Sequence, residues 1–303
     1  MNHGISILFR AIPLVMALFC FSYGACVYAA GDDPARLTAG PVIFFLGSIC
    51  TALYCTASTI IRQIIGTYNE AARYLFPTVA YAFALTTLVC GLFIASTGNA
   101  GSYVAGHAVC GLGLITACVA TAATASTRFS LIPLNSSATP GTINARGFGR
   151  GTVAALIAVP VIMSLAAWVW TAMLFITGTT AAHTVAGSVM AGIACVCTSL
   201  VALVASIARQ VRGSYGSRER ARWSSLVLVM GGAAFLFGLV MIFARWGGAT
   251  DFVGFILIGL GLICWSISSK VILLARIWHA DYPLARRIPI IPVITALACL
   301  FLA

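Results

Sequence analysis

Long apolar runs, broken by short polar segments, fill most of the chain and predict helices that cross a membrane. Nine runs stand out, at about 11–29, 37–61, 75–95, 103–126, 153–177, 184–208, 224–244, 252–276 and 288–303. About 20 apolar residues in helical form span a hydrocarbon core of about 30 Å. The runs are continuous and do not alternate every second residue, which favours helices over a β-barrel. We therefore expect an all-α, polytopic transmembrane helical bundle forming one domain over residues 1–303.

Composition supports lipid as the solvent of this chain. Of its 303 residues, 61% are hydrophobic and only 8% are charged, whereas a soluble domain carries about 25% charged residues. Most of the eleven cysteines stand inside the apolar runs, and no two of them have the C-x-x-C spacing of a metal or redox motif. We expect these cysteines to pack as small apolar residues, and we expect no metal and no cofactor.

Basic residues gather at one set of loops and helix ends, which predicts the orientation of the chain. Fifteen of the 17 Lys and Arg residues belong to this set: Arg10, Arg62, Arg73, Arg128, Arg146, Arg150, Arg209, Arg212, Arg218, Arg220, Arg222, Lys270, Arg276, Arg286 and Arg287. The opposite set holds only Arg36 and Arg245. By the positive-inside rule the N-terminus is cytoplasmic. The net charge of +11 therefore indicates a lipid bilayer as partner and not a nucleic acid.

The runs repeat as hairpins of two helices, at about 11–61, 75–126, 153–208 and 224–276, with a partial fifth at 288–303. The second helix of each hairpin begins with a motif glycine, Gly40, Gly106, Gly187 or Gly254. Seven residues later stand Gly47, Gly113, Ala194 and Gly261, and five residues later stand Phe45, Gly111, Gly192 and Gly259. Small residues let membrane helices approach closely. The spacing predicts that these glycines pack parallel hairpin repeats, and we expect a tenth helix to follow Ala303.

A second mark of the repeat is a proline near the start of the first helix of a hairpin. Pro13, Pro77 and Pro160 hold this place. Proline is tolerated in the first helical turn, where its missing N–H would have no partner. The sequence therefore predicts that these prolines, together with Pro292 in the partial fifth hairpin, lie near the cytoplasmic start of their helices.

Three stretches resemble the YhiM-like family of enterobacterial inner-membrane proteins. They are RQIIGTYNEAARYLFP at 62–77, YVAGHAVCGLGLI at 103–115 and RRIPIIPVITALACLFLA at 286–303. The resemblance implies a ten-helix protein of the bacterial inner membrane with no established biochemical activity and an association with survival of acid and other stresses. In the proteins of the family that the chain resembles, the sequence motif V-A-G-H occurs in several repeats. Here His107 matches, and Pro41, Ser188 and Phe255 stand at the equivalent positions.

Two candidate chemistries involve the residues around His107. The spacing of Gly106, Gly111 and Gly113 is faintly like a phosphate-binding loop, but the Lys-Ser/Thr pair that such a loop needs is missing. Helix packing explains these glycines better. His107 and His183 both fall near the outer start of a helix, and histidine changes charge near neutral pH. They are candidates for pH sensing, and the alternative is an ordinary histidine with a hydrogen-bond partner at the membrane interface.

Nothing in the sequence indicates catalysis. HExxH and G-x-S-x-G are absent, and no paired carboxylates lie in a run, so we expect no catalytic residue and no enzyme. Hydroxyl side chains inside the runs line a solute path in one interpretation and make helix contacts in another: Tyr54, Thr56, Tyr81, Thr86, Thr87, Ser164, Ser266 and Ser268. The leading hypothesis is a membrane protein that moves or senses a small solute and is linked to acid stress. The alternative is a structural or accessory protein without transport. The ligand stays open, and nothing predicts an oligomer.

Overall fold

The computed structural model confirms a helical membrane bundle and describes residues 3–31, 33–64, 67–127, 149–212, 215–244 and 250–277. Eight helices form this part of the chain: α1 His3–Ala29, α2 Pro34–Ile64, α3 Glu70–Ala95, α4 Ala100–Ser126, α5 Arg150–Thr177, α6 Ala181–Val211, α7 Ser217–Ala244 and α8 Thr250–Ile277. Hydropathy predicted nine helices, and the described residues form eight, so the predicted count is wrong for this part of the chain. The ninth run, at 288–303, lies outside them.

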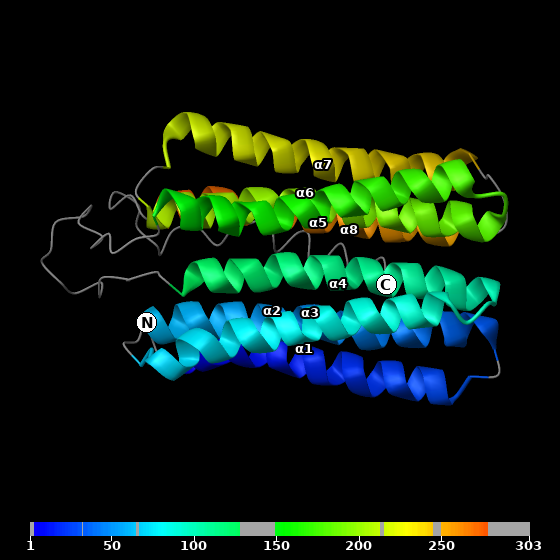
Figure 1. The fold of residues 1–303 in the computed structure, drawn as a ribbon, viewed down its shortest axis with the longest axis horizontal. Coiled ribbons are helices and arrows are strands. Elements are labelled where there is room, and N and C mark those ends of the chain that lie inside the picture. The colour runs from blue at the N-terminus through cyan, green and yellow to red at the C-terminus, as the bar shows by residue number, and fades with distance from the viewer. Residues whose placement is uncertain are drawn as a thin grey trace, which may run out of the picture.

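Consecutive helices run antiparallel. In the view of Figure 1, α1 lies at the bottom, α4 in the middle and α7 at the top. Each odd helix packs along the even helix that follows it. The even helices also contact one another in sequence, α2 with α4, α4 with α6 and α6 with α8, and so form an inner row. One end of the bundle carries the loops within the hairpins and is called the hairpin-loop end. The opposite end holds the start of α1 and is called the N-terminal end.

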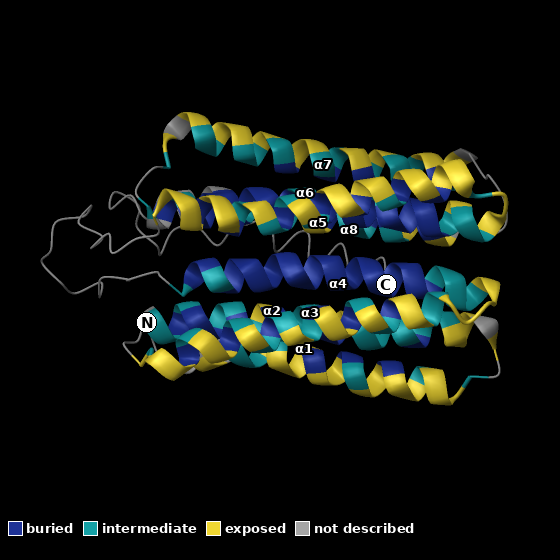
Figure 2. Ribbon diagram, in the orientation of Figure 1, coloured by how far each residue is buried: buried dark blue, intermediate teal, exposed yellow. Residues whose placement is uncertain are grey.

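How far a helix is buried depends on whether it belongs to the inner row. Nearly every residue of α4 and α6 is buried, whereas α1, α3, α5 and α7 show exposed outward faces (Figure 2). The exposed faces carry large apolar side chains such as Phe93, Ile176 and Phe243. Seven helices are long and apolar enough to cross a membrane, and the apolar part of α8 covers Phe252–Ser268. Faces of this kind are stable only against lipid, because no water-facing monomer exposes so much contiguous apolar surface.

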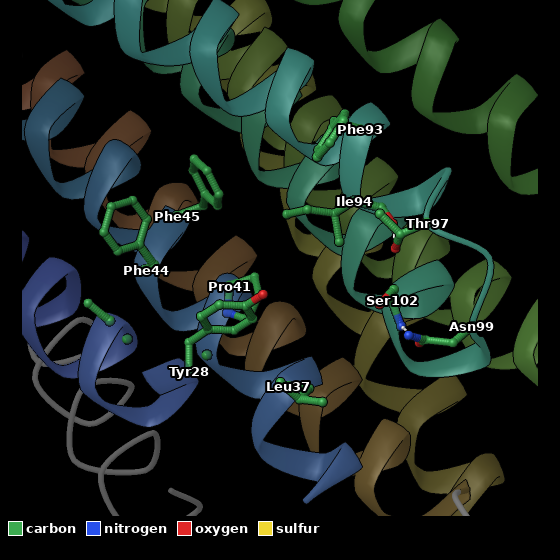
Figure 3. Close-up of a pocket in the computed structure, with 13 residues that line it drawn as sticks. Tyr28, Leu37, Pro41, Phe44, Phe45, Phe93, Ile94, Thr97, Asn99 and Ser102 are labelled. Carbon is green, nitrogen blue, oxygen red and sulfur yellow. Dashed lines mark hydrogen bonds between the residues drawn. The ribbon is translucent and has the colours of Figure 1, made fainter. Parts of the chain in front are cut away.

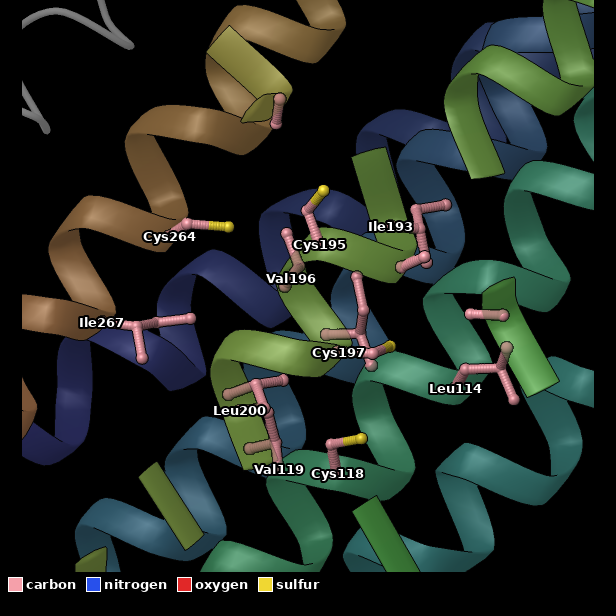
Figure 4. Close-up of a cluster of buried hydrophobic side chains, with 14 of the residues drawn as sticks. Leu114, Cys118, Val119, Ile193, Cys195, Val196, Cys197, Leu200, Cys264 and Ile267 are labelled. Atoms are coloured by element: carbon pink, nitrogen blue, oxygen red, sulfur yellow. The ribbon is translucent and has the colours of Figure 1, made fainter. Parts of the chain in front are cut away.

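Small and branched side chains fill the space between the inner helices. In the centre, Cys118 and Val119 of α4 lie near Cys197 and Leu200 of α6, with Cys264 of α8 on the far side of α6 (Figure 4). The described cysteines are free thiols, and most are buried. Small side chains here keep the inner helices close enough for dispersion contacts, which drive helix association when lipid competes for apolar surface.

Hydroxyl groups join several helices inside this apolar packing. The hydroxyls of Thr87 and Ser48 lie 2.9 Å apart between α3 and α2. Tyr81 reaches Thr121 at 2.9 Å, and Ser164 lies 2.8 Å from Thr198. Three of the eight hydroxyls that the sequence singled out therefore make contacts between helices.

Several helices begin earlier than their apolar runs. The Asn69 and Asn99 side chains cap α3 and α4 by accepting hydrogen bonds from the N–H groups of Ala72 and Ser102, so polar residues ahead of each run join the helix. This extension places the prolines beyond the first helical turn, in the first half of their helices. Pro77 lies inside α3, and Pro13 and Pro160 lie inside α1 and α5. A neighbouring helix supports the backbone there, which membrane helices exploit to tolerate internal proline.

The contact between Thr87 and Ser48 predicts a measurable contribution to stability. Thr87→Val removes the hydroxyl, so the hydroxyl of Ser48, which is 1% exposed, loses this hydrogen-bond partner. We expect the free energy of unfolding to fall by about 0.6 to 1.7 kcal/mol, the range found for hydrogen bonds between membrane helices. Thr86→Val, on the exposed face of α3, is the control. Equilibrium unfolding in mixed detergent micelles measures both variants, and equal losses would contradict the prediction.

Candidate functional site

The two candidate histidines lie at the hairpin-loop end, on neighbouring inner helices. His107 stands on the second turn of α4, and His183 stands in the first turn of α6. The Asn99 cap sets the start of α4 and so fixes the height of its first turns. Because α4 and α6 pack against each other and run in the same direction, their first turns meet, and the two histidines come together.

Aromatic rings connect the histidines. The ring of Tyr103 lies between them, with centroids 4.2 Å from His107 and 4.8 Å from His183. Trp170 of α5 presents its ring edge-on to His107 at 5.6 Å. These four residues, Tyr103, His107, Trp170 and His183, are called the histidine cluster. The cluster draws its members from three helices.

Hydrogen bonds orient both imidazoles. Nδ1 of His107 lies 2.7 Å from the carbonyl oxygen of Tyr103. A carbonyl oxygen only accepts, so this Nδ1 carries a hydrogen. In the neutral ring, Nε2 is then left as an acceptor. Nδ1 of His183 lies 2.6 Å from Oγ1 of Thr180, just before α6. His107 is therefore held through its Nδ1–H, whereas the Thr180 hydroxyl can either donate to or accept from Nδ1 of His183.

The two histidines differ in access to solvent. His107 is only 7% exposed, whereas His183 is half-buried. His183 is also close enough to interact electrostatically with His107. Among the described contacts of these imidazoles there are aromatic rings and a threonine hydroxyl, and no carboxylate. Positive charges on both imidazoles would therefore lie close together, with no carboxylate among these described contacts.

The motif glycines lie against the other helix of their own hairpin. A Cβ at Gly40 would lie 2.8 Å from the Cβ of Tyr28, and one at Gly106 would collide with the backbone of Ala95. A Cβ at Gly254 would lie 2.7 Å from the carbonyl oxygen of Gly238. Gly187 is looser, with 3.2 Å to the ring of Phe175. The glycines seven residues after the motif glycines also contact the other helix of their own hairpin. Gly47 lies against Phe21, Gly113 against Leu88 and Gly261 against Phe235.

The glycines five residues after the motif glycines contact a different helix. Gly111 of α4 lies against Ile193 and Met190 of α6, and Gly192 of α6 lies against Leu257 and Leu260 of α8. They therefore sit at contacts between repeats and not within a hairpin. Gly259 has no described atom within 4 Å of the position that a Cβ would take. The sequence grouped these glycines together, and the structure separates them by the helix they contact.

The N-terminal end carries an ion pair. Arg209 of α6 pairs with Glu219 of α7, and the hydroxyl of Tyr215 lies 3.0 Å from that of Ser206. Burial raises the pKa of the Tyr215 phenol, partly opposed by Ser206 and Arg220. No three histidine, cysteine or acidic side chains of the described ranges lie close enough together to hold a metal ion.

Sequence reasoning missed Tyr103, Trp170 and Thr180. Tyr103 had a local signal, because it stands four residues before His107 and so on the same face of α4. Trp170 and Thr180 belong to the next hairpin, and no spacing along the chain relates them to His107. Only the packing of α4 against α5 and α6 reveals them.

The fold and its apolar faces define a multi-pass helical membrane protein. The family of proteins of unknown function DUF2776 matches residues 1–303, and the chain belongs to this family. It is 39% identical to inner membrane protein YhiM of Escherichia coli (strain K12) over 310 residues, which covers all of this chain and 87% of that protein. The resemblance seen in the sequence is thereby confirmed, and the protein is a multi-pass protein of the inner membrane. No solved structure matches the chain.

The contact of Gly106 with α3 predicts a large effect of substitution. Gly106→Leu forces a side chain into the backbone of Ala95, and overpacking of this kind costs about 1–3 kcal/mol or more. Gly259→Leu is the matched control, because it introduces the same residue on an inner helix where no described atom is close. Thermal unfolding in detergent should show a lower melting temperature for the first variant alone. An equal loss in both would contradict the assigned contact.

Proposed function

We propose that the protein is a non-enzymatic integral membrane protein that senses acidity through its histidine cluster. One observation carries the proposal: two histidines from neighbouring inner helices face the same tyrosine ring, one half-buried and one almost fully buried. Histidine is the side chain whose charge changes between about pH 5 and pH 8. A pair that shares one ring responds to acid as a unit.

Charge repulsion supplies the response. With both imidazoles neutral, the tilted rings pack against Tyr103 and hold the starts of α4 and α6 together. When both are protonated, two positive charges face each other in an environment of low dielectric, where Coulomb repulsion is several-fold stronger than in water. The starts of the two helices are then pushed apart.

The contact just below the cluster transmits this change. Gly111 stands one turn after His107 and packs against Met190 and Ile193 of α6. Movement at the start of α4 therefore changes the α4–α6 contact within the inner row. Both helices are buried along nearly their whole length, which couples a local shift to the surrounding helices.

Sensing fits this geometry better than movement of a solute. The inner helices α4 and α6 pack on each other through glycine and branched side chains, and three of the candidate path hydroxyls make contacts between helices. The second candidate function is a structural or accessory membrane protein, which the same dense packing supports. The two candidates differ in one property, since the accessory protein has no acid response.

The proposed direction of sensing depends on orientation. We propose that the N-terminal end is cytoplasmic and that the hairpin-loop end, with its histidine cluster, faces the periplasm. The distribution of basic residues supports this assignment, because the sequence groups 15 of the 17 with the N-terminus when loops and run ends are assigned alternately to the two sides. The cluster then meets the pH outside the cell.

Acid should change the fluorescence of Trp170 through His107. A protonated imidazole at the edge of an indole quenches its emission, so lowering the pH from about 8 to about 5 should reduce Trp170 fluorescence in the wild type. His107→Gln with His183→Gln should abolish this change. Trp170→Phe identifies the contribution of Trp170 among the six tryptophans. If the double variant keeps the wild-type titration, the cluster is not the acid sensor.

Labelling in intact cells tests the orientation. Ser96→Cys lies at the hairpin-loop end and Gly216→Cys at the N-terminal end, both at exposed positions, in a background with Cys26→Ala. A membrane-impermeant maleimide should label position 96 in cells with a permeable outer membrane. Position 216 should react at least about tenfold less until the inner membrane is opened. The reverse pattern would place the cluster in the cytoplasm.

A further inference from the structure

A groove of about 530 Å³ opens at the hairpin-loop end between the first and second hairpins. Its walls come from the end of α1, the first half of α2, the end of α3 and the start of α4 (Figure 3). Tyr28, Phe44, Phe45, Phe93 and Ile94 supply most of the apolar wall. This volume lies within the range of about 300–1,000 Å³ that is usual for ligand sites.

A departure from the repeat supplies part of the groove wall. Five residues after their motif glycines, α4 and α6 carry Gly111 and Gly192, and the next inner helix packs directly on each. At this position α2 carries Phe45, which lines the groove. The phenyl ring takes the place of a glycine hydrogen atom here and forms part of the groove wall.

The polar groups of the groove stand at one end only. Thr97, Asn99 and Ser102 lie at the hairpin-loop end of the wall. The Thr97 hydroxyl donates to the carbonyl of Ile94, and the Asn99 side-chain oxygen accepts from the Ser102 N–H. The amide N–H groups of Asn99 remain to serve a further acceptor. The groove is thus apolar along its length and can donate hydrogen bonds at its mouth.

Charge at the same end favours an anionic group. Arg36, just before the groove residue Leu37, spends one guanidinium N–H on the carbonyl oxygen of Ala30, which leaves four N–H groups for another acceptor. Asp33 caps α2 by accepting from the Ala35 N–H. A phosphate with a neighbouring ammonium group, or a phosphate alone, complements this pair.

The setting of the groove selects its occupant. The rim side chains Tyr28 and Phe93 are 55% and 71% exposed on faces that contact lipid. Water requires two to four polar partners to occupy a hollow, and the inner wall offers none along the aromatic rings. An empty hollow of this size forfeits dispersion contacts on every wall. A flexible hydrocarbon chain satisfies both conditions.

A second hollow provides a contrast. It measures about 450 Å³ and lies between α5, α6 and α7, lined by Trp168, Phe175 and Phe237 among others. Its one lining threonine, Thr171, already donates to the carbonyl of Ala167. It has no polar end to orient an amphiphile, so it accepts lipid only as a general surface does.

We propose that the groove binds one phospholipid of the adjacent leaflet, with an acyl chain between Phe45 and Phe93 and the phosphate near Asn99 and Arg36. The site is independent of acid sensing, because its lining residues are not members of the histidine cluster. It assigns a bound lipid to the groove between the first two hairpins, which has the polar end that the second hollow lacks.

Native mass spectrometry tests the site on the full chain purified in mild detergent. The probes are palmitoyl-oleoyl phosphatidylglycerol, the matching phosphatidylethanolamine, and oleic acid, each titrated at low molar ratio. We expect the wild type to retain one phospholipid. Ala25→Trp and Ile94→Trp, which fill the groove from opposite walls, should reduce this retention at least about tenfold. Ala82→Trp, on the exposed face of α3 away from the groove, is the control and should bind as the wild type does.

Three results would overturn the proposal. Wild type and both groove-filling variants could retain equal amounts of phospholipid, the wild type could retain none, or oleic acid could displace the phospholipid at equal concentration. Arg36→Gln tests the headgroup and should weaken retention of phosphatidylglycerol several-fold. Unchanged retention would remove Arg36 from the site. Thermal unfolding of each variant verifies that the chain remains folded.

Discussion

The close approach of each inner helix to its hairpin partner at a motif glycine is the contact on which this structure depends. Lipid is as apolar as the side chains, so helices gain little by leaving it and associate through dispersion contacts at short range. Gly40, Gly106 and Gly254 permit that range, with backbone or Cβ atoms directly beside them. Paired in this way, the hairpins present their even helices to one another, and the inner row α2–α4–α6–α8 results.

The distinctive sites of this protein lie where one repeat carries a different side chain from the others. Phe45 stands where α4 and α6 have glycine, and a groove opens beside it. His107 stands where the other repeats have Pro41, Ser188 and Phe255, and it joins Tyr103 and His183. In a scaffold whose repeated positions serve packing, a bulky or titratable side chain at such a position alters the contact between neighbouring helices and creates a place where a ligand or a proton can act.

The start of α4 lies between these two places. Ser102 lines the groove on one side, and its neighbour Tyr103 contacts both histidine rings on the other. Successive residues of a helix point about 100° apart, so one turn serves two different neighbours. The Asn99 cap holds that turn in place. Because α4 is buried along nearly its whole length, a change at its first turn has few directions in which to relax.

The sequence by itself determined the helical membrane class, the approximate extent of each span and the position of the glycines, because hydropathy and spacing are properties of the chain alone. It did not include the residues that the Asn69 cap adds to α3, so Pro77 stands deeper in its helix than the apolar run indicated, and it named Gly106 and Gly111 in one packing motif without the helix that each contacts. Only the tertiary structure decided that Gly106 contacts α3 and Gly111 contacts α6, and that His107 meets His183. Those outcomes depend on which helix lies beside which, and residues 76 positions apart acquire a common neighbour only when the hairpins pack.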